Sequence, residues 1–185
     1  LLMATSFRPP HISWYQLTIE PNTRFYKSPP SLPLDDQLAD IQDHGEQLLS
    51  DHGFHNYEVS AYSHPGLAAR HNLNYWQFGD YLGIGAGAHS KLTTASGAIN
   101  RHWQTRLPLD YLNSDKPFTA GQRQLGTDEL PLEFAMNALR LSEGFSPSLF
   151  SAHTGLPFRV LEPAINQLIS RGLLERSELN VRPTR

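Results

Sequence analysis

Three things are missing from the 185-residue sequence: cysteine, a long apolar run and an excess of positive charge. Without cysteine the chain cannot form disulfides, thiolate zinc sites or a cysteine nucleophile, and it cannot alone hold an iron–sulfur cluster. No run of about 18 apolar residues occurs, so we expect no membrane-spanning helix. The formal net charge of −3 excludes a nucleic-acid protein that binds through bulk positive charge. With 39% hydrophobic residues the chain is typical of a globular protein, and we expect it in the cytoplasm.

The first part of the chain carries strand and helix signals in alternation. Residues 11–19 and 56–62 are rich in aromatic and β-branched side chains, and each run predicts a strand. Between them Asp35 offers a helix cap and Gly53 a helix stop, with an apolar stripe in between. The order strand, helix, strand predicts a βαβ unit with a parallel pair of strands.

The second part of the chain predicts a hairpin and then a separate small domain. Residues 91–94 and 98–105 flank a short turn and are typical of a β-hairpin. Residues 114–126 are polar and irregular, so we interpret them as a linker that closes a first domain, 1–113. Residues 127–185 predict three helices followed by a small β-wing, which is an α+β winged-helix pattern.

The hexapeptide HNLNYW at residues 71–76 is the most unusual segment. In a helix, His71 and Tyr75 share a face, as do Asn72, Tyr75 and Trp76. A neutral imidazole is a good axial ligand for haem iron, and adjacent aromatic rings can pack against a flat macrocycle. The alternative is a histidine packed on an aromatic cluster with its nitrogens satisfied. The residue types alone leave both interpretations open.

The glycine-rich segment 83–88 formally matches a dinucleotide-binding fingerprint. The segment leads into a predicted hairpin instead of a helix, and no acidic ribose ligand follows about 20 residues later, so we reject that function. It predicts either a strand end that approaches a ligand or a tight turn. Glu20 follows the first predicted strand, where a parallel barrel binds its ligands, whereas Glu58 lies nearer the start of its strand.

A winged-helix tail raises the alternative of nucleic-acid binding. The third predicted helix, residues 158–171, carries only Arg159 and Arg171 as bases. A specific DNA-binding helix needs phosphate-neutralising bases around it. We therefore favour a structural or protein-binding wing and expect no nucleic-acid partner.

Several blocks of the chain, in order, resemble the HemW-like radical SAM family, also described as oxygen-independent coproporphyrinogen III oxidase-like. Residues 11–23 (HISWYQLTIEPNT), 57–62 (YEVSAY) and 81–90 (YLGIGAGAHS) resemble successive blocks of the family. Residues 71–76 match the HNxxYW motif of its haem-chaperone branch. Residues 127–185 resemble its C-terminal winged-helix domain.

The resemblance implies an α/β fold, the C-terminal part of a partial (β/α) barrel, which binds S-adenosylmethionine and a [4Fe–4S] cluster. It makes His71 the candidate ligand of haem iron, the one candidate metal ligand in this chain. It places Tyr75 and Trp76 beside the porphyrin, and it places the end of the first strand near Thr18 and the block with Gly85, Gly87 and His89 in the S-adenosylmethionine pocket. Asn72 and Glu20 are two further candidate cofactor-binding residues.

The chain departs from the family in one respect, because the cluster motif CxxxCxxC is absent. We therefore expect a C-terminal fragment that cannot cleave S-adenosylmethionine alone and that lacks the N-terminal half of its barrel. An unpaired strand edge in such a fragment predicts poor solubility or homodimerisation.

The resemblance implies part of a radical SAM haem chaperone that binds haem and passes it to haem-accepting proteins. The alternative is part of an anaerobic coproporphyrinogen III dehydrogenase in porphyrin biosynthesis, and a winged-helix nucleic-acid binder is a further one. Membrane association of a full-length protein stays open.

Overall fold

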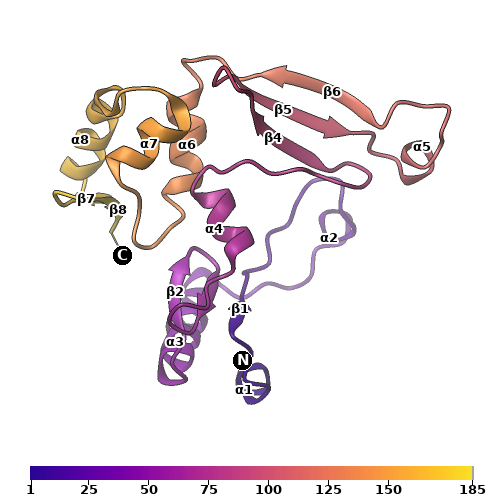
Figure 1. Cartoon of the computed structure of the whole chain (residues 1–185). Coiled ribbons are helices and arrows are strands. Elements are labelled where there is room, and N and C mark those ends of the chain that lie inside the picture. Colours follow the sequence, from indigo (N-terminus) through magenta and orange to yellow (C-terminus); the bar gives the residue numbers. More distant parts are fainter. Residues whose placement is uncertain (185) are drawn as a thin grey trace. The chain divides into compact units, whose positions relative to one another are not determined.

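The computed structural model describes residues 1–184 and divides by its internal contacts into two compact units, Leu1–Ala69 and Arg70–Arg185. This division lies earlier in the chain than the predicted linker at 114–126. Among the helices of residues 1–184, none is both long enough and apolar enough to cross a bilayer. Figure 1 shows the helices and strands of both units, coloured along the sequence.

The first unit contains three helices and one small antiparallel sheet. Its elements are α1 (Leu2–Ser6), β1 (His11–Ser13), α2 (Arg24–Lys27), α3 (Asp35–Asp51), β2 (His55–Glu58) and β3 (Ala61–Ser63). The sheet has the order β1-β3-β2, and both strand pairs are antiparallel.

The predicted parallel pairing was therefore wrong, although the helix between the strands was predicted correctly. The run 56–62 is not one strand, because the chain reverses after Glu58 and returns as β3, which lies between β1 and β2. The predicted strand 11–19 ends at Ser13. Within the described chain, residues 15–20 have no ladder partner, and a strand needs one to satisfy its backbone groups.

A small core holds the first unit together. Ile12, Leu49, Phe54 and Tyr62 are buried against one another, and Trp14 packs on this cluster. Gly45 is the weakest helix former inside α3, and its position explains it, because a Cβ there would overlap the Trp14 ring. The glycine lowers the helix propensity of α3, but it lets the Trp14 indole approach the helix backbone closely.

The second unit joins a three-stranded sheet to a helical domain with a wing. It consists of α4 (Arg70–Trp76), β4 (His89–Thr93), β5 (Ile99–Gln104), α5 (Pro108–Tyr111), β6 (Thr119–Gln124), α6 (Leu130–Ala138), α7 (Pro147–Thr154), the 3-10 turn η1 (Phe158–Val160), α8 (Glu162–Ser170), β7 (Leu174–Arg176) and β8 (Val181–Pro183). The predicted hairpin is confirmed as β4 and β5, and so are the three helices and the β7–β8 wing.

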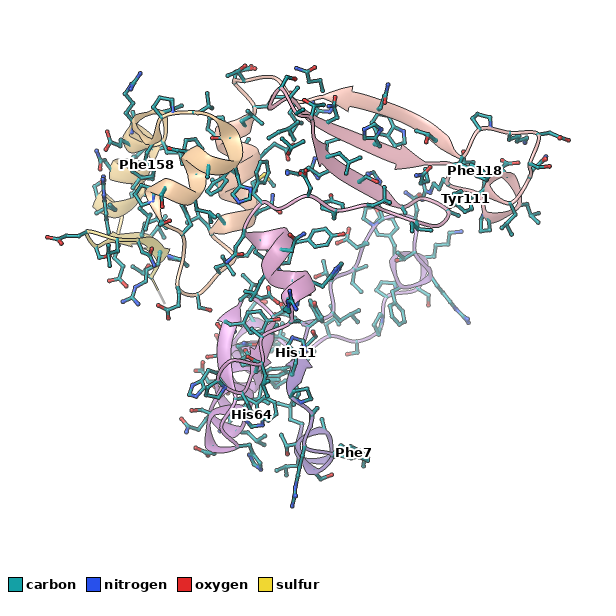
Figure 2. The ribbon with its side chains drawn as sticks, viewed as in Figure 1. Phe7, His11, His64, Tyr111, Phe118 and Phe158 are labelled. Atoms are coloured by element: carbon teal, nitrogen blue, oxygen red, sulfur yellow. The ribbon has the colours of Figure 1, made fainter. Side chains whose placement is uncertain are left out.

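The polar stretch predicted to be an irregular linker contains strand β6, which pairs with β5. Sequence patterning missed this strand because it is almost wholly exposed and lacks alternating apolar residues. Gly121 lies under the ring of Trp103 on β5, which leaves no room for a Cβ. Beyond the sheet, Tyr111 and Phe118 lie side by side near α5 (Figure 2), with ring centroids 5.5 Å apart.

Phe134 of α6 is the centre of the second core. Its fully buried ring contacts those of Phe78, Phe145 and Phe150 in edge-to-face arrangements, with centroids 5.0 to 5.6 Å apart. Such aromatic contacts add to the free energy that burial alone provides. The core therefore ties the segment that follows α4 to the helical domain.

Replacing Phe134 with alanine tests this core. We expect Phe134→Ala to lower the free energy of unfolding by about 3–5 kcal/mol, because it leaves a cavity among three rings. Leu132→Ala on the same helix is the control, since Leu132 is 66% exposed and its truncation should change stability by about 0.5 kcal/mol or less. Chemical denaturation followed by circular dichroism measures both, and equal losses would contradict a core centred on Phe134.

Candidate functional site

A cleft of about 710 Å³ lies beside α4 in the second unit. Its walls come from one face of α4 and from the segment that follows: Arg70, His71, Leu73, Asn74, Tyr75, Gln77, Asp80, Tyr81 and Leu82. Its volume lies in the usual range for small-molecule sites. All of its walls belong to one compact unit.

The turn after α4 creates the cleft. Phe78 ends the helix in the left-handed conformation, with φ at 62°, which a bulky residue rarely adopts. Its ring is buried against Phe134, and that packing offsets the backbone strain. The backbone N–H of Gly79 then donates to the Asn74 carbonyl at 2.7 Å, and the Asn74 side chain donates to the Asp80 carbonyl at 2.9 Å. The chain thus folds back along α4.

His71 lies exposed on the wall of this cleft. Its imidazole makes an edge contact with the Tyr75 ring, with centroids 4.8 Å apart. Within residues 1–184 no hydrogen bond engages its ring nitrogens, whereas those of His11, His44 and His64 are bonded. The contact with Tyr75 matches the aromatic packing of the alternative interpretation, and the role of His71 as a ligand stays a prediction.

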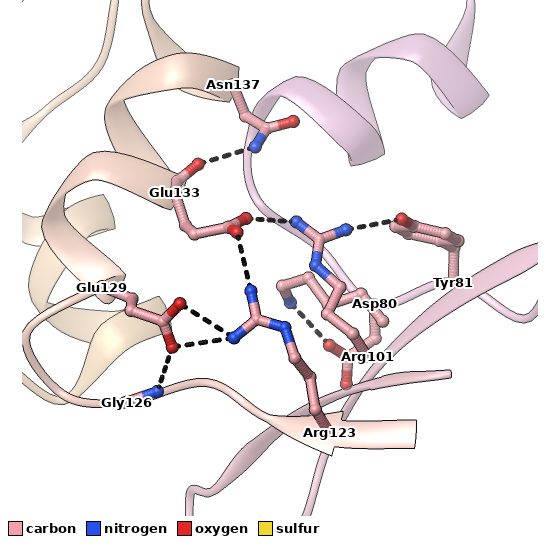
Figure 3. A network of polar contacts seen from close by, with 9 residues as sticks. Asp80, Tyr81, Arg101, Arg123, Gly126, Glu129, Glu133 and Asn137 are labelled. Atoms are coloured by element: carbon pink, nitrogen blue, oxygen red, sulfur yellow. Dashed lines mark hydrogen bonds and ion pairs between the residues drawn. The ribbon is translucent and has the colours of Figure 1, made fainter. Parts of the chain in front are cut away.

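An aromatic wall continues from His71. Tyr75 stacks on Tyr81 with centroids 4.1 Å apart and planes 28° apart. Burial, with a smaller contribution from Tyr81, raises the pKa of Tyr75, so its hydroxyl stays protonated well above neutral pH. The Tyr81 hydroxyl accepts a hydrogen bond from Arg101 at 2.8 Å, and Arg101 in turn pairs with Glu133 of α6 (Figure 3).

Asp80 forms the acidic end of the cleft. Its carboxylate accepts hydrogen bonds from the buried Lys91 ammonium at 2.8 Å and from the Thr93 backbone and hydroxyl groups at 2.7 and 2.8 Å. Partial burial acts to raise the pKa of Asp80, but these hydrogen bonds outweigh it and hold the pKa below its ordinary value. The carboxylate is therefore committed to partners within the protein.

Some residues of the hexapeptide 71–76 line the cleft, and others pack elsewhere in the second unit. His71 and Tyr75 line the cleft, while Asn72 and Trp76 are not among its walls. Trp76 instead packs under Arg140, whose guanidinium carbon lies 4.3 Å from the ring centroid. Sequence reasoning missed the other cleft residues, of which the first four could be found from their helical spacing: Arg70, Leu73, Asn74, Gln77, Asp80, Tyr81 and Leu82.

The glycine-rich segment 83–88 is a turn whose backbone donors bind within the protein. The Gly83 N–H donates to Ser90 at 2.9 Å, that of Gly85 to the Tyr111 hydroxyl at 3.1 Å, and that of Gly87 to the Thr105 carbonyl at 2.9 Å. Strand β4 follows, beginning at His89, so no helix opens here. The rejection of a dinucleotide loop agrees with this geometry. The role of Gly85, Gly87 and His89 toward S-adenosylmethionine stays a prediction.

The remaining candidates lie in the first unit. Thr18 and Glu20 are exposed in an irregular segment, so the expectation that they close a strand was wrong. The Glu20 carbonyl accepts a hydrogen bond from Thr23 at 2.7 Å. Glu58 is 1% exposed at the end of β2. Their roles toward a ligand stay predictions.

Metal-binding clusters are absent from the described chain, which places no three His, Cys, Asp or Glu side chains together for one ion. With no cysteine in the sequence, the residues present do not fit a thiolate-bound iron–sulfur cluster. The role of His71 as a ligand of haem iron stays a prediction.

Known proteins share sequence with most of this chain. Residues 125–185 match the HemN C-terminal domain family. The chain is 47% identical over 174 residues to a protein named heme chaperone HemW from Escherichia coli, which covers 94% of this chain. Most of this chain is thus similar in sequence to the HemW-like radical SAM family. A second HemW, from Haemophilus influenzae, is 45% identical over 94% of this chain.

The chain spans about half the length of these two HemW proteins, namely 46% of the first and 45% of the second. A solved structure described as coproporphyrinogen III oxidase (HemN) from Escherichia coli, a radical SAM enzyme, has the same fold, with a TM-score of 0.71. The match covers 99% of this chain and 46% of the chain in the solved structure, and the two sequences are 14% identical. This likeness supports the mixed α/β fold, in which the present chain forms small sheets and no closed barrel.

The Asp80–Lys91 pair predicts a pH-dependent stability. We expect Asp80→Asn to lower the free energy of unfolding by about 2 kcal/mol at neutral pH, because it leaves the buried Lys91 ammonium without its anion. The pKa of Asp80 is lowered in the folded state, so its stabilisation is complete above the unfolded pKa and is lost as the pH falls through the folded one.

Denaturation of both proteins between about pH 2 and pH 7 measures this difference, which should be constant above about pH 5 and shrink below pH 4. Asp110→Asn is the control, because the Asp110–Lys116 pair is exposed and should contribute about 0.5 kcal/mol or less. A difference between wild type and Asp80→Asn that grows as the pH falls would contradict the assignment.

Proposed function

We propose that this chain supplies the haem-binding site of a haem chaperone, with His71 as the axial ligand of the iron. The observation that carries this proposal is an exposed imidazole, free of hydrogen bonds within residues 1–184, on the wall of an aromatic cleft. The names of the relatives, heme chaperone HemW, point to the same cargo.

The cleft combines an aromatic surface with polar side chains, which suits a flat macrocycle that carries polar substituents. Tyr75 and Tyr81 present a stacked aromatic surface beside His71, and such surfaces pack well against flat π-systems. The ligand and the wall belong to one short helix and the turn after it, so they are held at fixed spacing. Since His71 is exposed, haem bound there stays within reach of an acceptor protein.

S-adenosylmethionine and a [4Fe–4S] cluster belong to the proposal for the full-length protein. Thr18, Glu20, Gly85, Gly87 and His89 would contact S-adenosylmethionine, whose bound form supplies radical chemistry in this family. Cluster ligands would have to come from outside this cysteine-free chain, so we assign its residues no step in that chemistry.

Nucleic-acid binding by the wing is disfavoured by the third helix. Helix α8 has the sequence EPAINQLIS and carries no lysine or arginine. A recognition helix depends on such residues to neutralise phosphates and read bases.

A haemin titration followed by absorbance tests the proposal. We expect saturable binding to the wild-type chain with a sharpened Soret band, and an affinity at least about tenfold lower for His71→Ala, because the iron loses its protein ligand. His55→Ala is the matched control, since His55 is also exposed but lies in the first unit. Equal affinities of wild type and His71→Ala, or no saturable binding to folded wild-type protein, would overturn the proposal.

A further inference from the structure

Only two charged side chains, Arg70 and Asp80, are among the residues that line the cleft. The Asp80 carboxylate is already neutralised by Lys91 and bonded by Thr93. The net charge that the cleft offers to a ligand therefore comes from Arg70.

Arg70 is uncommitted in the structure of residues 1–184. No ion pair, hydrogen bond or aromatic contact engages its guanidinium, and its side chain is exposed. Three other arginines of the second unit are engaged, since Arg101 and Arg123 pair with glutamates and Arg140 stacks on Trp76. What sets Arg70 apart from the remaining arginines is its place on the cleft wall. An unpaired guanidinium in a cleft is a ready partner for an anion, since its planar fork matches a carboxylate.

The spacing on α4 separates this cation from the aromatic wall. Residues four apart on a helix lie above one another, so His71 and Tyr75 form one row and Arg70 and Asn74 form the next. One row offers a metal ligand and a ring, and the other offers a cation and an amide. A ligand that lies along both rows needs a flat metal-bearing face and an anionic edge.

We propose that Arg70 binds a propionate carboxylate of the tetrapyrrole and so orients it in the cleft. This inference rests on the proposed function. Because Asp80 is neutralised by Lys91, the one uncompensated charge on the cleft wall is that of Arg70, and the anionic edge of the macrocycle turns toward it. The site is then selective for metalloporphyrins with ionised carboxylates.

Esterification of the ligand tests the assignment. The wild-type chain, Arg70→Gln and Arg70→Lys are each titrated with haemin and with haemin dimethyl ester, in which both propionates are uncharged. We expect wild type to bind haemin about tenfold more tightly than the ester, in line with one charge-assisted hydrogen-bonded pair. Arg70→Gln should bind the two ligands within about twofold, and Arg70→Lys should keep part of the preference, since it retains the charge but loses the fork.

Two controls separate this inference from the proposed function. Arg159→Gln removes an exposed arginine of the helical domain and should keep the wild-type preference for haemin. His71→Ala should weaken both ligands equally, because the iron is the same in each. An equal preference for haemin in wild type and Arg70→Gln would overturn the role of Arg70 while leaving His71 as the ligand. Failure of wild type to bind either ligand would overturn the proposed function together with this inference.

Discussion

The buried Lys91 ammonium is the interaction on which the cleft depends. It lies 4.3 Å from the centroid of the Phe78 ring and 2.8 Å from the Asp80 carboxylate. A buried ammonium needs both an anion and close packing, so the sheet strand that carries it fixes the turn after α4. Because that turn returns the chain along the helix, Tyr81 meets Tyr75 face to face. The stacked Tyr75 and Tyr81 wall of the cleft therefore depends on the buried Lys91 ammonium behind it.

Ion pairs link the sheet that carries Lys91 to helix α6. Arg101 joins the Tyr81 hydroxyl to Glu133, and Arg123 joins Glu133 to Glu129, so a chain of pairs links the sheet to α6 (Figure 3). Networks of this kind hold their members in one geometry more firmly than isolated surface pairs do. With these cations committed to the framework, the surface of the cleft can offer a single arginine to a ligand without the framework loosening.

Local chemistry was readable from the sequence, whereas pairing partners were not. The hairpin, the three helices and the wing were predicted because turn residues, caps and apolar periodicity act within a few residues. The predicted parallel pair was wrong because residues 56–62 contain no glycine or proline to mark the reversal after Glu58, which sets β3 between its neighbours. Strand β6 failed because an exposed edge strand needs no apolar face. In the same way, His71 was found from its motif, but Asp80 and Tyr81 enter the cleft through a turn that a distant core residue stabilises.

Under the proposed function, the HNxxYW motif has to meet two requirements within one short helix. A cargo ligand must be exposed and free of hydrogen bonds, which costs the helix any stabilisation from that side chain. The same helix has only seven residues, too few to be stable alone. Trp76 meets this second demand, since its ring packs under Arg140 on the side away from the cleft and ties the helix to the helical domain. Ligand and anchor therefore occur together in sequence because each is of use only when the other holds the helix in place.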